Sequence, residues 1–398
     1  MAKKKILLPL MEDNITTDDL KEVTKLIKKK PILTQSKKVL EFEKKWSKWL
    51  GVKYSIFVNS GSSANLLSIL ALKIFRKLNT KGEIIVPSLT WISDIVAVIN
   101  NNLKPVFVDI NLDNLSMNEE EIYKKITKNT KAVFITHAQG FNGLSNKLLN
   151  FLKKKKIDLI EDVCESHGAK FKNKKLGTFG IISNFSFYYA HHLSTIEGGM
   201  ICTNNKEIYK ISRMLRSHGM LRESGDKNYE KKIINKYSML SPKFIFMYPG
   251  FNMRNNEISA VIGINQLKKL NRNNIKRNRN LKYFLKKLNG NTFYKNFNME
   301  GISNYAFPLI LNKKYKHLRD KLEKKMKLNG IEFRRGNAGG GNQLRQPYLK
   351  KYTKKINLKK FPNVDHVHFY GYYIGNFPTL SFKTIDKVLN TINLIDTN

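Results

Sequence analysis

Two adjacent histidines lie in a short polar loop near the middle of the chain. An apolar stretch at 185–189, predicted to be a strand, precedes His191 and His192, and a Glu-Gly-Gly turn at 197–199 leads into a second predicted strand. Imidazole has an unperturbed pKa of about 6.5, so it can take up and return protons near neutral pH. Lys and Arg account for 72 of the 398 residues, yet neither occurs at 176–205. The loop therefore favours proton transfer, because imidazole is not a primary amine and cannot form a Schiff base.

Carboxylates follow another apolar stretch, at 157–161. Asp162 ends this stretch, which is predicted to be a strand, and Glu165 comes three residues later. Ligand groups gather at the carboxyl ends of strands in α/β proteins, so we expect Asp162 to contact a ligand. His167 is expected to be structural.

A third segment has the composition of a phosphate site. A β-rich run at 54–59 leads into Gly61, Ser62 and Ser63, small residues at the predicted start of a helix. Backbone N–H groups and hydroxyls at a helix N-terminus suit a phosphate, although Ser-Gly-Ser is also a common helix cap. Predicted strands and helices alternate through this half of the chain, which indicates a mostly parallel sheet covered on both faces.

In order and spacing these segments resemble the DegT/DnrJ/EryC1/StrS family of sugar aminotransferases, which bind pyridoxal phosphate (PLP). The resemblance extends over about residues 5–395. It implies an α/β protein with the PLP-dependent aspartate aminotransferase fold (fold type I). The expected domains are a large PLP-binding domain with a mixed sheet and an N-terminal arm, residues 1–270, and a smaller C-terminal α/β domain, residues 271–398.

His191 stands six residues before the Glu of the Glu-Gly-Gly turn, where the family has its Schiff-base lysine. His191 at this position, together with Glu165 where the aminotransferases usually have Gln, resembles the residues of the sugar 3-dehydratase branch of the family. The resemblance implies C3 dehydration (deoxygenation) of a nucleotide-linked 4-keto-6-deoxyhexose, with GDP-4-keto-6-deoxy-D-mannose as the expected substrate. His191 would be the catalytic base, and glutamate would convert PLP to pyridoxamine phosphate (PMP). Such a reaction belongs to 3,6-dideoxysugar and lipopolysaccharide O-antigen biosynthesis.

The resemblance also implies roles for other residues. A protonated pyridinium ring is the electron sink of PLP, and Asp162 corresponds to the family aspartate at the ring nitrogen. Trp91 corresponds to the aromatic residue that stacks on the ring, although a core tryptophan at a strand-to-helix junction is the alternative. The remaining cofactor residues are Gly61, Ser62, Ser63, Ser186, Glu165 and, across a homodimer interface, Asn252. The implied substrate residues are His218, Arg222, Arg254 and Asn342, although a solvated loop explains His218 and Arg222 equally well.

Three alternatives remain at this stage. A nucleotide-sugar aminotransferase that works without the usual lysine would share these motifs and differ in its product. A non-catalytic family member would bind PLP without turnover. A CDP-sugar dehydratase with an iron–sulfur cluster is disfavoured, because Cys164 and Cys202 are the only cysteines and one such cluster takes four.

Composition restricts the partners further. The formal net charge is +41, but the lysines are scattered with Asn and Ile and do not interleave with aromatic residues as in single-strand binders. We therefore expect a solvated basic surface and no nucleic-acid partner. The N-terminal apolar run is too short for a signal peptide, and no apolar run is long enough for a membrane span, so the expected location is cytoplasmic. His366 and His368 could share one strand face, but no further metal ligands are evident and no metal is expected.

Overall fold

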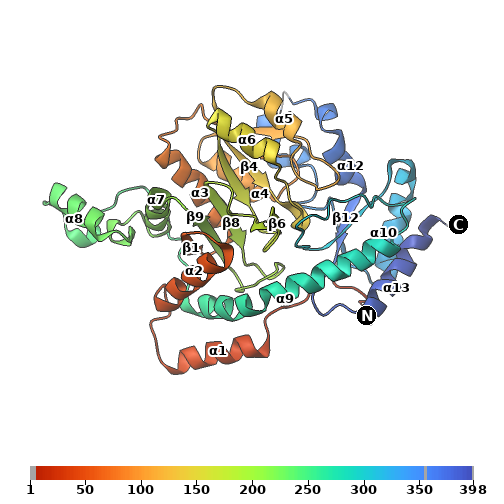
Figure 1. The fold of residues 1–398 in the computed structure, drawn as a ribbon, viewed down its shortest axis with the longest axis horizontal. Coiled ribbons are helices and arrows are strands. Elements are labelled where there is room, and N and C mark those ends of the chain that lie inside the picture. Colours follow the sequence, from red (N-terminus) through yellow and green to blue (C-terminus); the bar gives the residue numbers. More distant parts are fainter. Residues whose placement is uncertain (1–5, 354–355, 397–398) are drawn as a thin grey trace.

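The computed structural model describes residues 6–353 and 356–396, and a seven-stranded mixed sheet lies at its centre (Figure 1). Strand β9 runs antiparallel to both of its neighbours, whereas the other neighbouring strands are parallel to one another. The mixed sheet expected for the large domain is therefore confirmed. In spatial order its strands are β1 (Tyr54–Val58), β9 (Gly199–Thr203), β8 (Ile182–Ser186), β5 (Asp158–Asp162), β4 (Thr130–Thr136), β2 (Glu83–Pro87) and β3 (Lys104–Val108).

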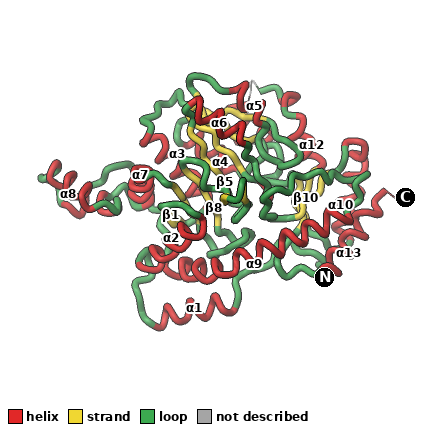
Figure 2. Tube along the Cα trace, in the orientation of Figure 1, coloured by secondary structure: helices red, strands yellow, loops and turns green. Residues whose placement is uncertain are grey.

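Apolar side chains of the central strands alternate between two cores, one on each face of the sheet. Phe134 and Ile160 belong to the first core, and their chain neighbours Val133 and Leu159 belong to the second. Because both faces are buried under helices, these strands read as continuous apolar runs in the sequence. Figure 2 shows the strands enclosed by helices. The first core includes α3 (Gly61–Phe75), α4 (Ile92–Asn100) and α7 (Lys206–Arg216), and the second includes α2 (Lys37–Leu50), α5 (Glu119–Lys125) and α6 (Asn146–Lys155).

The C-terminal part has a sheet of its own, which is antiparallel and three-stranded, and its core is continuous with the first core. The expected strand around His366 and His368 is wrong, because both residues lie in α12 (Pro362–Tyr370). Pro362 occupies the first turn of that helix, where its missing N–H group has no intrahelical partner to lose. The other elements here are β10 (Phe307–Ile310), β12 (Gly371–Ile374), β11 (Phe333–Arg335), α10 (Arg319–Leu328) and α13 (Phe382–Asn393).

Helix α9 (Glu257–Lys287) joins the two parts as one continuous helix of 31 residues (Figure 1). Its apolar period predicts an end at 270, but the helix continues, so the expected domain boundary lies inside it. Between 271 and 280 its buried residues are polar, before Leu281, Phe284 and Leu285 return the helix to apolar packing. Asn274, Arg277 and Asn280 donate hydrogen bonds to oxygen atoms of neighbouring segments, which replaces apolar packing by polar contacts.

Two peripheral features complete the fold. Helix α8 (Lys227–Lys236) projects from the sheet, and α1 (Thr17–Lys28) packs on α9 (Figure 1). The strand expected at 185–189 ends earlier, at Ser186, because the Phe187 carbonyl accepts the Thr195 N–H at 2.9 Å instead of continuing the pairing with β9. Among the described residues, none of the helices combines the length and apolar character that a bilayer crossing requires.

Candidate active site

A cavity of about 490 Å³ lies where β4, β5 and β8 end side by side. Thr136, Asp162 and Ser186, the last residues of these strands, all line it. Parallel strands place their carboxyl ends at one edge of a sheet, which is why three polar residues distant in sequence meet here. The start of α3, the loop at 188–191 and segments of the C-terminal part complete the wall.

Asp162 lies at the base of this cavity and is only 4% exposed. Its Oδ1 accepts the Cys164 backbone N–H at 2.8 Å, and its Oδ2 accepts Asn65 Nδ2 at 3.1 Å. These donors fix the carboxylate plane before any ligand binds. An anion so oriented can hold a protonated ring nitrogen.

The N-terminus of α3 forms a second side of the cavity. Gly61 and Ser62 line it, and Ser60 caps the helix by accepting the Ser63 backbone N–H at 3.0 Å. A Cβ atom on Gly61 would lie 2.6 Å from Cβ of Ser186, so only glycine allows this approach of helix and strand. Exposed N–H groups and the Ser62 hydroxyl at this helix end are suited to a phosphate. The Ser63 side chain does not line the cavity and instead receives a hydrogen bond from Ser60 Oγ.

Trp91 occupies the N-cap position of α4 and is 59% exposed, although it lines the cavity. The alternative of a core tryptophan is therefore excluded by its exposure. A large aromatic side chain that remains this exposed beside a polar cavity offers a flat face to a ring-shaped ligand.

His191 lines the cavity, whereas His192 does not. Burial lowers the pKa of His191 to about 4; the Asp162 charge opposes this shift and Arg277 adds to it. The imidazole is consequently neutral at physiological pH and can accept a proton. His192 is 2% exposed, and its Nε2 lies 3.1 Å from the Ser303 carbonyl oxygen, so it belongs to the packing behind the site.

Glu165 is part of the same wall and accepts the Gln139 backbone N–H at 2.8 Å. Burial raises the pKa of Glu165 to about 7, opposed by this hydrogen bond and aided by Asp162. A carboxyl group with that pKa can exist in either protonation state near neutral pH. His167, expected to be structural, packs against Phe185 and Phe187 outside the cavity.

The residues that the family resemblance implies for substrate binding do not line the cavity. Asn342 is buried and bonded within the protein: its Nδ2 donates to Asp365 Oδ1 at 2.7 Å, and its Oδ1 accepts the Leu344 N–H at 2.9 Å. His218 is exposed and has a left-handed backbone, with φ of 60°. Arg222 is exposed and donates to the Lys243 carbonyl at 3.2 Å.

Asn252 and Arg254 also lie outside the cavity of their own chain. Arg254 Nε donates to Asn252 Oδ1 at 3.0 Å on the surface. Arg254 borders a neighbouring hollow, whose lining shares Glu197 with the cavity. Glu197 therefore lies in the walls of both the cavity and the hollow that Arg254 borders.

Several residues that line the cavity were not predicted from the sequence. Arg334, on β11, brings an exposed cation to the wall, and Tyr305 and Tyr373 bring phenol groups. All three come from the C-terminal part of the chain. The adjacent arginines at 334–335 were a usable signal, because neighbouring charges of this kind are rarely buried and point to solvent or to a ligand.

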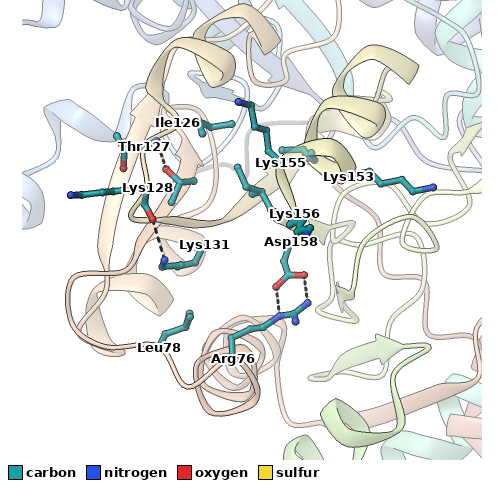
Figure 3. Close-up of a pocket in the computed structure, with 13 residues that line it drawn as sticks. Arg76, Leu78, Ile126, Thr127, Lys128, Lys131, Lys153, Lys155, Lys156 and Asp158 are labelled. Carbon is teal, nitrogen blue, oxygen red and sulfur yellow. Dashed lines mark hydrogen bonds and ion pairs between the residues drawn. The ribbon is translucent and has the colours of Figure 1, made fainter.

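A second hollow, of about 1020 Å³, lies at the opposite edge of the sheet, where β4 and β5 begin. Figure 3 shows lysines around it and the ion pair between Arg76 and Asp158, whose Nε and Oδ2 are 2.8 Å apart. Its single carboxylate is thereby neutralised. This hollow lacks the acid–base combination of the cavity at the carboxyl edge, so the candidate site is the smaller one.

Together the cavity residues fit PLP. They provide an oriented carboxylate for a ring nitrogen, an exposed aromatic face and a helix N-terminus for a phosphate. The signature of the DegT/DnrJ/EryC1/StrS aminotransferase family matches residues 13–393. The chain belongs to this family.

Several members of this family are similar to this chain over nearly its whole length. A GDP-4-keto-6-deoxy-D-mannose 3-dehydratase from Escherichia coli O55:H7 is 34% identical over 376 residues, which are 93% of this chain and 96% of that protein. The structure of the E. coli 3-dehydratase with bound hydrated PLP has a TM-score of 0.89 at 32% identity and covers 98% of this chain and 100% of that chain. A structure of GDP-4-keto-6-deoxymannose-3-dehydratase with a trapped PLP-glutamate geminal diamine has a TM-score of 0.84 at 31% identity, covering 97% and 100%.

Proposed function

We propose that this protein is a PLP/PMP-dependent lyase that removes the C3 hydroxyl of a nucleotide-linked 4-keto-6-deoxyhexose. GDP-4-keto-6-deoxy-D-mannose is the proposed substrate, and glutamate is the proposed amino donor that regenerates PMP. The observation that carries the proposal is that His191 lines the same cavity as Asp162, at the position where the resemblance implies a Schiff-base lysine. The similarity to 3-dehydratases over nearly the full chain supports the same reaction.

Each wall of the cavity has a part in this scheme. Asp162 orients and charge-balances the ring nitrogen, Trp91 covers the ring, and the start of α3 with Ser62 and Ser186 binds the phosphate. The bound cofactor supplies an electron sink, which lowers the barrier to removing a proton from carbon. Glu165 is in the wall and can hold a proton at neutral pH.

His191 is the proposed base. Its Nδ1 is buried and makes no hydrogen bond within the described part of the chain, so we assign proton transfer to Nε2. The proton that Nε2 accepts is then available to the departing C3 hydroxyl, which leaves as water. A lysine amine in this position would compete for the same carbon and favour an aminosugar product.

Two alternatives lead to different products. An aminotransferase that works without the lysine would release an aminosugar and no ammonia. A non-catalytic family member would bind PLP and consume no substrate. The first alternative retains support from the sugar transaminases among the relatives, such as a Campylobacter jejuni protein that is 30% identical over 304 residues.

The test is mass spectrometry of the products formed from GDP-4-keto-6-deoxymannose, glutamate and PLP, together with an ammonia assay. We expect a sugar that has lost the C3 oxygen, with one ammonia released per turnover. His191→Asn should lower turnover by about 10²- to 10⁴-fold, as expected for the loss of a general base, while PLP absorbance of the purified protein persists.

His192→Asn is the matched control, because this neighbouring histidine lies outside the cavity. It should retain turnover. An active His191→Asn variant would refute the assignment, and an aminosugar product would establish the transaminase alternative.

We also propose that the protein works as a cytoplasmic homodimer with shared sites. Support for association comes from exposed apolar side chains at 244–251, the segment that leads into Asn252 and Arg254. Phe244, Phe246 and Phe251 are 61%, 57% and 40% exposed. Association of two copies would bury this surface and bring Arg254 of each copy to the other's cavity.

Complementation tests this arrangement. His191→Asn and Arg254→Ala are each expected to be poorly active as pure proteins. If Arg254 acts across the interface, random mixing of the two variants restores about one quarter of the sites, because each hybrid dimer has one intact site. If Arg254 acts in its own chain, or not at all, mixing gives only the average of the two activities.

A further inference from the structure

A second buried carboxyl group lies behind Asp162. Asp94 is 0% exposed and belongs to the first turn of α4, three residues after Trp91. Its Oδ2 accepts hydrogen bonds from the hydroxyls of Thr90 and Thr136, both at 2.5 Å. These three side chains come from different elements and converge at the carboxyl edge of the sheet, so Asp94 is held in one position.

Asn65 connects the two carboxyl groups. Its Nδ2 lies 2.6 Å from Asp94 Oδ1 and 3.1 Å from Asp162 Oδ2. Asn65 is on α3, the helix whose N-terminus forms the proposed phosphate site. One amide group thus aligns both carboxyl groups relative to the phosphate end of the cavity.

The protonation of Asp94 and Asp162 depends on their mutual repulsion and on their burial. Neither carboxyl group forms an ion pair with a cation in the described part of the chain, and both are nearly inaccessible to water. Two adjacent buried carboxylates would repel each other and both would lose hydration. Burial, and then Asp162, raise the pKa of Asp94 well above its ordinary value, although the two threonine hydroxyls and the helix N-terminus favour the charged form. Desolvation and repulsion oppose a second negative charge here, which favours one proton on the pair.

We propose that Asp94 is a positioning residue that retains this proton and donates it in a hydrogen bond to Asp162, leaving Asp162 as the single anion at the ring nitrogen of the cofactor. The inference rests on the proposed function, which supplies the PLP ring. Hydrogen-bond donors stabilise an ionised carboxylate. By donating to Asp162, Asp94 makes that carboxylate a weaker base, so the proton on the ring nitrogen does not transfer to it. The pyridinium ring then remains an effective electron sink.

The test uses PLP labelled with ¹⁵N in its ring, bound to the full-length protein, and the ¹⁵N chemical shift at pH 7.5. We expect a pyridinium signal in the wild type and in Asp94→Asn. An amide keeps residue 94 uncharged and can donate to Asp162. Rotation of the Asn65 amide turns its Oδ1, which is buried without a partner in the described residues, toward the second hydrogen. In Asp94→Ala the donor is lost, so the signal should move toward unprotonated pyridine.

Affinity gives a second measurement. Loss of a hydrogen bond to a charged group corresponds to about a 10- to 100-fold change in an equilibrium constant, so Asp94→Ala should weaken PLP binding by that factor. Asp109→Asn is the matched control, since Asp109 is also buried but accepts backbone N–H groups of residues 363–364 and does not line the cavity. It should leave the ¹⁵N shift and the PLP affinity unchanged.

The outcomes separate the hypotheses. If Asp94→Asn behaves like Asp162→Asn and loses the pyridinium signal, Asp94 is the anion of the pair and the proposal is overturned. If Asp94→Ala keeps the wild-type shift and affinity, Asp94 has no influence on the ring and the proposal is also overturned. If the wild-type protein itself fails to bind PLP, the proposed function fails first.

Discussion

His167 provides a quantitative prediction, because its ring is fully buried in an aromatic cage. The side chain is 0% exposed and packs against Trp46, Phe185 and Phe187, with ring centroids 5.7 Å away in each case. Neither of its ring nitrogens makes a hydrogen bond of good geometry within the described part of the chain. Replacing His167 by Phe removes two unsatisfied polar atoms but inserts a somewhat larger ring. At pH 7.5 these two effects on stability oppose each other, so the diagnostic quantity is the change of stability with pH.

The pH dependence gives the magnitude. Burial, with His192 and His191 adding repulsion, lowers the pKa of His167 well below its ordinary value. The unfolded chain therefore binds a proton below about pH 6.5 that the folded protein does not, so the folded state loses stability as the pH falls. One such group contributes about 1.4 kcal/mol per pH unit, or about 2 kcal/mol between pH 6.5 and 5.0.

The assay is urea unfolding followed by circular dichroism at several values of pH from 7.5 to 5.0. The free energy of unfolding of His167→Phe minus that of the wild type should grow by about 2 kcal/mol over the acidic part of this range. The subtraction cancels groups common to both proteins, such as Glu165, whose raised pKa acts in the opposite direction. His317→Phe, at an exposed position, is the control and should follow the wild-type curve. Parallel curves for His167→Phe and the wild type would refute the reasoning.

Two further predictions concern the cofactor and the fold. Trp91→Ala should weaken PLP binding by about 2- to 10-fold, as expected for one lost aromatic pair, with Trp91→Phe near the wild type. Fluorescence titration measures this, and unfolding should change by less than about 0.5 kcal/mol because the side chain is exposed. Glu43→Gln should destabilise the protein by about 3–5 kcal/mol in urea unfolding, since it leaves the buried Arg216 guanidinium, 2.6 Å from Glu43, without its counter-charge. A loss below 1 kcal/mol would show that a neutral amide suffices there.

The central sheet was predictable from the sequence because its strands are covered on both faces. Continuous apolar runs such as 84–87 and 132–135 are expected in strands that are buried on both faces. The end of the strand at 158–162 placed Asp162 at the carboxyl edge of the sheet. His191 could be distinguished from His192 only by its spacing from the Glu-Gly-Gly turn, since the two side chains are chemically identical. The structure separates them, with one in the cavity and one against Ser303.

Polar contacts were harder to predict. The continuity of α9 past 270 was not predicted because its buried residues at 271–280 are amides and a guanidinium, which bond to loop carbonyls that sequence periodicity does not reveal. Asp94 was missed for a related reason. An acidic residue in the first turn of a helix is usually a dipole partner exposed to solvent, and nothing in the local sequence indicates that Asp162 lies behind it.

Helix α9 limits how the cavity can open. A helix of 31 residues is about 46 Å long, and it contains no proline at which it could bend. Its one glycine, Gly263, leaves no room beside the Phe42 ring. A hinge between the two parts would have to break main-chain hydrogen bonds of this helix. We therefore expect access of a bulky nucleotide sugar to depend on short loops such as 336–341 around a stiff frame, with local gating instead of domain rotation.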